Sequence, residues 1–239
     1  MDAFVGKSSK KKLLMKSNND SVRQKIYAND GNPEVLRHVP IDAGLKILDV
    51  GCGAGDNAKA LQEQGHTVDG ITLSEKEATF ACEFSRNVYV HNLEQGLPAE
   101  CLHQNYSYVL CSHVLEHICF PEKLLADIYK CLEIDGTLVV ALPNIMFLRN
   151  RWNLLRGRFN YEKCGLMDNT HFRWYTYETS RDLFRKNGYD VIERYVTGYL
   201  PMGPVRRILP VICSKLDHVL CRAWPGLFGL QLILRCKKA

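Results

Sequence analysis

The chain has 239 residues, of which 46% are hydrophobic and 24% are charged, and its formal net charge is +5. This length and composition allow one domain with a complete hydrophobic core and some local insertions. The excess of lysine and arginine is compatible with an anionic partner without identifying one. The first residues contain no uninterrupted apolar run of the kind that signal peptides have.

A basic segment opens the chain. Five lysines occur between residues 7 and 16, among serines and asparagines and with little apolar periodicity. This pattern predicts a mobile arm over residues 1–20, followed by one folded domain over residues 21–239. Two interpretations of the arm stay open: a solubilising tail, or a segment that contacts nucleic acid or anionic lipid. For the domain itself we do not expect a nucleic-acid partner.

Ten cysteines lie mostly within apolar runs, and no C-x-x-C pair occurs. This placement predicts free thiols in a reducing compartment, and it removes the commonest zinc-binding spacing. Four metal-type side chains do lie close together in the sequence, namely Cys111, His113, His117 and Cys119. A strand end followed by a loop would direct these side chains apart, so we expect no metal site there.

Runs rich in valine, isoleucine and leucine alternate along the chain with helical patterns. Such alternation is typical of a parallel sheet covered by helices on both faces. The predicted fold class is therefore α/β, a Rossmann-like, doubly wound and mostly parallel sheet. The expected strands span residues 45–50, 66–71, 87–91, 106–111, 137–142, 189–197 and 227–236, and the expected helices span residues 57–64, 75–84, 121–132 and 177–187.

Two segments interrupt this alternation. Residues 144–176 carry five arginines interleaved with aromatic residues, which predicts an inserted substrate lid. The alternative is a surface helix and loop whose aromatic side chains only cover the sheet edge. Residues 201–226, bounded by prolines, mix apolar with basic residues and are too charged to span a bilayer. They predict a C-terminal amphipathic helical insertion that either covers the core or contacts an anionic membrane peripherally.

The strongest chemical signal is ILDVGCGAGDNA at residues 47–58, where an apolar strand runs into a glycine-rich turn and then a helix. Glycines permit positive φ angles and close approach of a ligand to the backbone, and a helix N-terminus offers free N–H groups. A dinucleotide fingerprint would need glycine at position 56, where this chain has Asp56. The carboxylate of Asp49 beside the turn also suits a cationic ligand better than a pyrophosphate.

This segment resembles the first motif of the class I S-adenosylmethionine-dependent methyltransferases, an apolar strand and an acid followed by G-x-G-x-G. The resemblance runs from about Ile47 to Asn144 and implies that S-adenosylmethionine is the cofactor. The stretch VLCSHVLEH is similar to the part of the family that lies beside the methionine end of the cofactor, which implies that Ser112 and His113 lie there and that Ser112 contacts the cofactor. In the turn, the resemblance implies contacts with Asp49, Gly51, Cys52, Gly53 and Gly55.

Two positions depart from the pattern of the family. Methyltransferases commonly end the second strand with an acid that holds both ribose hydroxyls, whereas this chain has Thr72. The cyclopropane fatty acid synthase group is similar in its G-[IVL]-T-[LI]-S segment, which implies that Thr72 and nearby Glu77 hold the ribose here. After the third strand, Asn92 and Leu93 stand where an acid often accepts the adenine amino group. An asparagine amide oxygen accepts the same hydrogen bond without charge assistance.

The segment PNIMFLRNRWNLLRGRFNYEKCGLMDNTHFRWYT, residues 143–176, resembles methyltransferases of bacterial polysaccharide or O-antigen assembly and, more distantly, the methionine-biosynthesis W group. The resemblance implies a small-molecule acceptor, with a sugar or a carrier-lipid-linked glycan first. Arg158 and Arg173 are candidate contacts for an anionic sugar or a phosphate, because guanidinium groups form forked hydrogen bonds. Ordinary surface charge is the alternative for both.

Methyl transfer to a hydroxyl requires an aligned nucleophile, and a base assists it. Histidine suits that task near neutral pH. His171, flanked by Asp168 and Arg173, is the first candidate, and Asp168 is expected to orient or charge-stabilise its imidazole. His117 is the second candidate, with a structural role as the alternative for each histidine.

A second class of function stays open, a non-catalytic protein that binds S-adenosylmethionine or regulates a partner. A polar group near the transferred methyl would indicate an enzyme, and an apolar blockade would indicate the other class. We expect a cytoplasmic protein or one peripheral to the inner face of a membrane, and the sequence specifies no oligomeric state.

Overall fold

The computed structural model describes residues 31–41 and 44–239. The predicted basic arm at residues 1–20 and the predicted start of the domain at residue 21 lie outside the described residues. All ten cysteines lie inside them and are free, as expected from their apolar surroundings.

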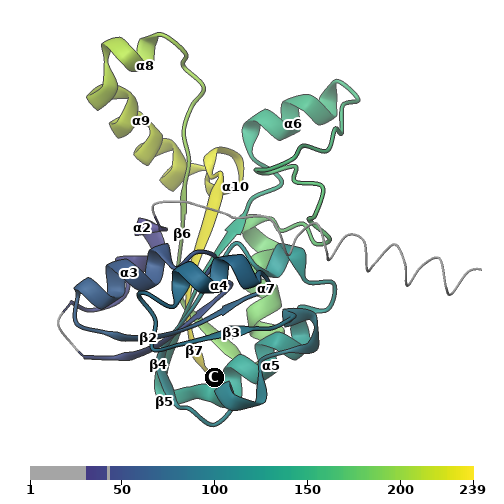
Figure 1. The fold of residues 1–239 in the computed structure, drawn as a ribbon. Coiled ribbons are helices and arrows are strands. Elements are labelled where there is room, and N and C mark those ends of the chain that lie inside the picture. Colours follow the sequence, from purple (N-terminus) through teal and green to yellow (C-terminus); the bar gives the residue numbers. More distant parts are fainter. Residues whose placement is uncertain (1–30, 42–43) are drawn as a thin grey trace, which may run out of the picture.

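The described residues form a seven-stranded sheet (Figure 1). Its strands are β1 (Lys46–Val50), β2 (Thr67–Thr72), β3 (Asn87–Val90), β4 (Tyr106–Ser112), β5 (Leu132–Pro143), β6 (Tyr189–Thr197) and β7 (Gln231–Lys238). They lie in the order β3-β2-β1-β4-β5-β7-β6. The first five pair in parallel, whereas β7 runs antiparallel to both of its neighbours. This arrangement confirms the predicted mostly parallel, doubly wound sheet.

Helices cover the sheet and extend beyond it. The helices are α2 (Pro33–Leu36), α3 (Asp56–Glu63), α4 (Glu75–Ala81), α5 (Pro121–Cys131), α6 (Leu148–Leu155), α7 (Tyr177–Lys186), α8 (Val205–Ile208), α9 (Pro210–Ala223) and α10 (Pro225–Phe228). Three short 3-10 turns are η1 (Leu93–Gln95), η2 (Ala99–Cys101) and η3 (Leu115–His117). Among the described residues, no helix combines the length and the apolar character that crossing a membrane requires.

The central strands of the sheet, such as β1 and β2, are buried on both faces, as their near-continuous apolar runs predict. Successive side chains of a strand point to opposite faces, so neighbouring residues enter different cores. Ile47 packs in one core cluster with Leu61 of α3, while Leu48 lies in the other with Leu124 of α5 and Phe184 of α7. The rigid sheet therefore fixes where the loops at the carboxyl ends of its strands begin.

Both predicted insertions emerge at that edge of the sheet. Residues 144–176 follow β5 and contain α6, and residues 201–226 follow β6 and contain α8 and α9. Figure 1 shows α6 and the pair α8–α9 projecting beyond the same end of the sheet. The last strand begins at Gln231 rather than at the predicted residue 227, because Pro225 starts the short helix α10. Ligands of open α/β sheets bind outside the carboxyl ends of the strands, which is where these projections lie.

Candidate functional site

The turn between β1 and α3 has three glycines with positive φ, at +79° for Gly51, +54° for Gly53 and +94° for Gly55. A Cβ on Gly51 would overlap the Val114 side chain, and one on Gly55 would lie 2.8 Å from the Cα of Ala81. The packing of the chain therefore already requires glycine at positions 51 and 55. The turn is held to the sheet because the backbone N–H groups of Gly51 and Cys52 both donate to the Ile71 carbonyl at 2.9 Å.

Asp49 lies in β1 immediately before this turn and is fully buried. No group of the described residues donates a well-formed hydrogen bond to either of its carboxylate oxygens. Burial raises the pKa of Asp49 to about 7, an effect that the Asn57 side chain opposes only in part. Buried polar groups normally have partners, so this carboxylate is prepared for a cationic group that the chain itself does not supply.

The end of β2 brings Thr72 and Glu77 together, as the sequence predicted. The Thr72 hydroxyl donates to Glu77 Oε2 at 2.7 Å, and both residues are buried. Thr72 Oγ1 also accepts from the Ser74 backbone N–H at 3.2 Å, which fixes its orientation. Glu77 comes from the first turn of α4, where Ser74 is the N-cap. A carboxylate thus stands at the strand end even though the strand itself ends in threonine.

Asn92 follows β3 and caps η1, with its Oδ1 accepting from the Glu94 backbone N–H at 3.1 Å. That bond uses one of the two lone pairs of the amide oxygen, so a second donor can still be accepted. Leu93 is half-buried and packs against the main core cluster. The adenine contact predicted for these two residues stays a prediction that this geometry permits.

Ser112 ends β4, and its hydroxyl accepts from Asn32 Nδ2 at 2.9 Å. The next residue, His113, has φ of +56°, which is uncommon for a side chain other than glycine and is frequent at functional sites. His113 Nδ1 lies 3.2 Å from Glu116 Oε1, and Nε2 lies 2.7 Å from Gln231 Oε1. Burial lowers the pKa of His113, but the bonds to Glu116 and Gln231 outweigh it and raise that pKa.

The two candidate catalytic histidines come from different segments and meet. His117 ends η3 and His171 lies in the 144–176 insertion, and their ring centroids are 4.7 Å apart in an edge-to-face arrangement. The insertion is fixed against η3 because the backbone N–H groups of Phe172 and Arg173 both donate to the Glu116 carbonyl. Burial, and then the neighbouring His117, lower the pKa of His171, which favours the neutral form of its imidazole.

The hydrogen bonds of Asp168 differ from the predicted arrangement. Asp168 Oδ1 accepts from the Thr170 hydroxyl at 2.6 Å and from the Thr170 backbone N–H at 2.8 Å. Thr170 Oγ1 in turn lies 3.0 Å from His117 Nδ1. Asp168 therefore reaches His117 through Thr170, while His171 Nδ1 lies 3.2 Å from the Leu166 carbonyl. The sequence paired Asp168 with His171 because they are near in sequence, but the Asx turn at Asp168 directs the carboxylate to Thr170.

The two predicted substrate arginines have different surroundings. Arg173 Nε donates to the Cys119 carbonyl at 2.8 Å and so helps to hold the insertion on the loop after η3. Arg158 lines a polar hollow of about 210 Å³, together with residues that include Arg149, Asn153 and Asn160. The position of Arg158 in this hollow is compatible with the predicted contact to an acceptor. Arg173 instead uses its Nε in a hydrogen bond that holds the insertion in place.

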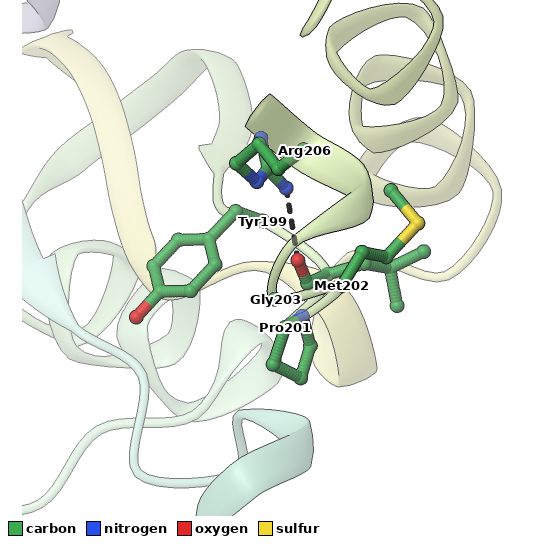
Figure 2. A pocket seen from close by; sticks show the side chains of 6 residues that line it. Tyr199, Pro201, Met202, Gly203 and Arg206 are labelled. Atoms are coloured by element: carbon green, nitrogen blue, oxygen red, sulfur yellow. Dashed lines mark hydrogen bonds between the residues drawn. The ribbon is translucent and has the colours of Figure 1, made fainter. Parts of the chain in front are cut away.

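A second hollow of about 480 Å³ lies where β6 leads into α8, and its lining is mainly apolar (Figure 2). Tyr199, Pro201 and Met202 line it, and Arg206 Nη2 closes one side by donating to the Leu200 carbonyl at 2.9 Å. The Tyr199 ring lies 5.8 Å from that of Phe147, the residue before α6. The bases of the two projections are therefore in contact.

Three residues of this region were not predicted from the sequence: Glu116, Thr170 and Gln231. Glu116 is buried, and its Oε2 has no hydrogen-bond partner among the described residues. The D-x-T spacing of an Asx turn could have indicated Thr170. No local pattern could have indicated Gln231, because it joins His113 from a strand that is distant in sequence.

A model of the methyltransferase domain family matches residues 23–194, which is more than half of the chain. The chain belongs to the methyltransferase domain family. This confirms the sequence-based identification at the level of the family, and S-adenosylmethionine is the cofactor that it implies. The finer resemblance to polysaccharide-assembly and methionine-biosynthesis W methyltransferases remains a prediction.

Individual methyltransferases show more limited similarity. The ubiquinone biosynthesis O-methyltransferase of Pseudomonas entomophila is 29% identical over 113 residues, which are 43% of this chain and 46% of that protein. The corresponding protein of Pseudomonas savastanoi pv. phaseolicola is 30% identical over 113 residues, with the same coverage. The chain thus spans about half the length of these curated relatives.

Solved structures of methyltransferases match over nearly the whole chain. A SAM-dependent methyltransferase from Archaeoglobus fulgidus has a TM-score of 0.61 at 19% identity, covering 95% of this chain and 99% of that one. A SAM-dependent methyltransferase from Thermotoga maritima, described as a possible histamine N-methyltransferase, has a TM-score of 0.58 at 19% identity, covering 99% and 96%. At these identities the match establishes the fold.

The site of this methyltransferase fits its cofactor at three places. Asp49 presents a buried carboxylate without a donor beside the glycine turn. Glu77, held by Thr72, presents a second carboxylate at the next strand end, and Asn92 presents an amide at the strand end after that. By their chemistry these groups can accept hydrogen bonds from the amino group, the ribose hydroxyls and the adenine amino group of S-adenosylmethionine respectively, and the individual contacts stay predictions.

Proposed function

We propose that this chain transfers a methyl group from S-adenosylmethionine to a hydroxyl of a small-molecule acceptor, first a sugar or a carrier-lipid-linked glycan. The observation that carries this proposal is the meeting of His117 and His171, with rings 4.7 Å apart, at the carboxyl edge of the sheet. The bound cofactor supplies an electrophilic methyl group on a sulfonium. The chain must then orient an acceptor hydroxyl and assist its deprotonation, which are tasks for which two convergent imidazoles are suited.

The orientation of both rings supports this role. A carbonyl oxygen only accepts hydrogen bonds, so the Leu166 carbonyl assigns the proton of His171 to Nδ1. For His117, the Thr170 carbonyl at 3.2 Å makes the same assignment. The Nε2 atom of each ring consequently keeps its lone pair and can act on an acceptor. Two histidines fixed in this manner favour an enzyme over a non-catalytic protein.

The two hollows of the projecting segments support an acceptor with polar and apolar parts. The polar hollow around Arg149 and Arg158 can receive hydroxyl or phosphate groups, and the apolar hollow beside Met202 can receive a hydrocarbon part. The relatives named for O-methylation support an oxygen acceptor over a nitrogen acceptor. The resemblance of residues 143–176 to polysaccharide-assembly methyltransferases supports a sugar.

We further propose that the projecting helices contact an anionic membrane. Apolar side chains of α8 and α9 are exposed, including Ile208 at 76%, Val211 at 65% and Ile212 at 60%. Within residues 201–226 the only acidic side chain is Asp217, which pairs with Arg206 at 2.8 Å, while the basic residues Arg207, Lys215 and Arg222 remain in excess. A surface that is both apolar and basic is complementary to anionic lipid.

A screen with labelled S-adenosylmethionine tests the proposed reaction. Nucleotide sugars, glycans and lipid-linked sugars are offered as acceptors, and turnover on the acceptor found is compared between the native chain and His171→Ala. We expect cofactor affinity to stay nearly unchanged and turnover to fall by about 10²–10⁴-fold, the usual range for lost acid–base assistance. Full turnover by His171→Ala would remove His171 from the reaction and leave His117 or positioning alone.

A further inference from the structure

We propose that Glu116, His117 and His171 form a binding site for one divalent transition-metal ion such as Zn²⁺. One carboxylate oxygen and one ring nitrogen from each histidine lie within 4.8 Å of one another. The three residues come from two segments that the fold brings together, since Glu116 and His117 belong to η3 and His171 belongs to the 144–176 insertion. The set of metal-type side chains noted in the sequence, for which no metal was expected, shares only His117 with this site.

The ring orientations of the two histidines match those of metal ligands. A ligating histidine usually donates its other ring N–H to a carbonyl, a carboxylate or a water, which fixes the tautomer and directs a lone pair to the ion. His117 Nδ1 lies 3.2 Å from the Thr170 carbonyl, and His171 Nδ1 lies 3.2 Å from the Leu166 carbonyl. Both rings thus present Nε2 as the atom with a free lone pair.

The third ligand is a carboxylate that the fold buries without satisfying it. The Glu116 side chain is 1% exposed, and its Oε1 is used by His113 at 3.2 Å. Glu116 Oε2 has no hydrogen-bond partner among the described residues. Burial of a carboxylate oxygen without a hydrogen-bond partner destabilises the folded chain, and a cation bound beside that oxygen would offset the destabilisation.

The distances require only small adjustments on binding. Bonds of about 2.0 Å to a tetrahedral zinc ion place neighbouring ligand atoms roughly 3.3 Å apart. Side-chain shifts of about 1 Å would therefore close the triangle. Two histidines and one carboxylate are the protein ligands of catalytic zinc sites and of facial iron sites, both of which leave positions open for a further ligand.

An open coordination position gives the ion a role in the proposed reaction, and this part of the inference depends on that function. A hydroxyl bound to a divalent ion loses its proton to solvent more readily. The oxygen then forms its bond to the methyl carbon as the carbon–sulfur bond breaks, and that electron pair remains on sulfur in the neutral thioether. His117 and His171 would assist the acceptor through the ion rather than by taking the proton themselves.

Metal titration of the full chain tests the site without any acceptor. The exposed thiols are first removed by Cys82→Ser and Cys164→Ser, because free cysteines also bind zinc. Zn²⁺ affinity is then measured by calorimetry, and Co²⁺ absorption reports coordination by nitrogen and oxygen. The variants are His171→Ala and Glu116→Gln, with His218→Ala on the exposed surface of α9 as the matched control.

We expect one ion per chain, a loss of affinity of at least about tenfold in each ligand variant, and no change in His218→Ala. Unchanged S-adenosylmethionine binding shows that the variants fold. Absence of stoichiometric binding, or binding that neither ligand variant weakens, would overturn the site. If turnover depends on His171 but no ion binds, the proposed function stands and this inference fails. If the ion binds but no acceptor is methylated, the metal site stands and the proposed function fails.

Discussion

The protonation state of Asp49 affects folding and ligand binding in opposite ways. The ligand-free folded chain is more stable with a neutral carboxyl, whereas a cation requires the ionised carboxylate. Its pKa is raised to about 7 by burial, so the folded chain holds a proton there that the unfolded chain releases at lower pH. The free energy of unfolding therefore falls as pH rises from about 4 to about 7, and it stays at this lower level above pH 7. A cationic ligand, in contrast, binds best once the carboxylate is ionised.

We predict that Asp49→Asn stabilises the ligand-free chain at about pH 8, by up to about 4 kcal/mol, since one pKa unit corresponds to about 1.4 kcal/mol. The difference should shrink as pH falls and become small near pH 4, where the carboxyl is protonated in the folded chain and about half protonated in the unfolded chain, whose ordinary pKa is 3.8. The affinity of the native chain for S-adenosylmethionine should rise between about pH 6 and about pH 7.5, while that of Asp49→Asn stays low and flat. Denaturant titrations and calorimetry measure these quantities.

The exposed Asp135 provides the control for this prediction. Asp135→Asn makes the same chemical change without altering a buried group. Its stability and its cofactor affinity should therefore show the same pH dependence as those of the native chain. If Asp49→Asn behaves like Asp135→Asn, Asp49 neither strains the ligand-free chain nor binds the cation.

Single residues were predictable where a strand end fixes them. Asp49 and Thr72 lie at the ends of buried strands, and Glu77 lies in the first turn of the next helix. The meeting of Thr72 and Glu77 is therefore a consequence of local geometry. The partner of His171 was not predictable in this way. Its neighbour in space is His117, and that contact depends on how the insertion packs against η3, which no spacing within either segment encodes.

At the scale of elements, the boundaries followed the apolar periodicity closely. The predicted strand at residues 189–197 is β6, and the predicted helix at residues 177–187 is α7 to within one residue. Two strand starts are exceptions. β5 begins at Leu132 rather than at the predicted residue 137, and the last strand begins at Gln231 although residues 227–230 looked as apolar as those that follow. Pro225 at the first helical position and the turn that it starts take these residues out of the sheet.

The projecting helix α9 is the element on which the membrane proposal depends. We predict that the chain co-sediments with vesicles of phosphatidylglycerol and phosphatidylcholine at low salt, and much less with phosphatidylcholine alone. High salt should reduce binding, because salt screens the electrostatic attraction between the basic residues and the anionic lipid. Replacing the exposed Ile212 by serine should weaken binding roughly tenfold, since inserting its side chain contributes on the order of 1.5 kcal/mol.

Ile134→Ser is the matched control, because Ile134 is 88% exposed and lies near the start of β5, at the opposite edge of the sheet. Equal losses in the two variants would mean that general hydrophobicity, and not the α9 surface, causes the binding. No co-sedimentation of the native chain would leave α8 and α9 as a cover for the sheet end.

At the scale of the molecule, the alternation of strands and helices was sufficient to predict a parallel, doubly wound sheet, but not its strand order. The consecutive parallel pairs β1–β2, β2–β3 and β4–β5 are each joined by a helix, and that local rule produces the neighbours β3-β2-β1 and β4-β5 but not the pairing of β1 with β4. The position of β7 follows no such rule. It lies between β5 and β6 and runs against both, so its place depends on contacts across long stretches of chain.

That position of β7 also has a consequence for the time course of folding. Pairings such as Leu138 with Cys236 close a long loop. Such contacts form slowly because the chain loses conformational entropy on closing the loop before the new contacts stabilise it. We expect the cofactor half, β1 to β4, to form first, and the half that carries both projections to form only when β7 inserts. Pulse-labelled hydrogen exchange during refolding should protect the amides of β1 and β4 before those of β6 and β7. Simultaneous protection would show instead that the two halves form as a single unit.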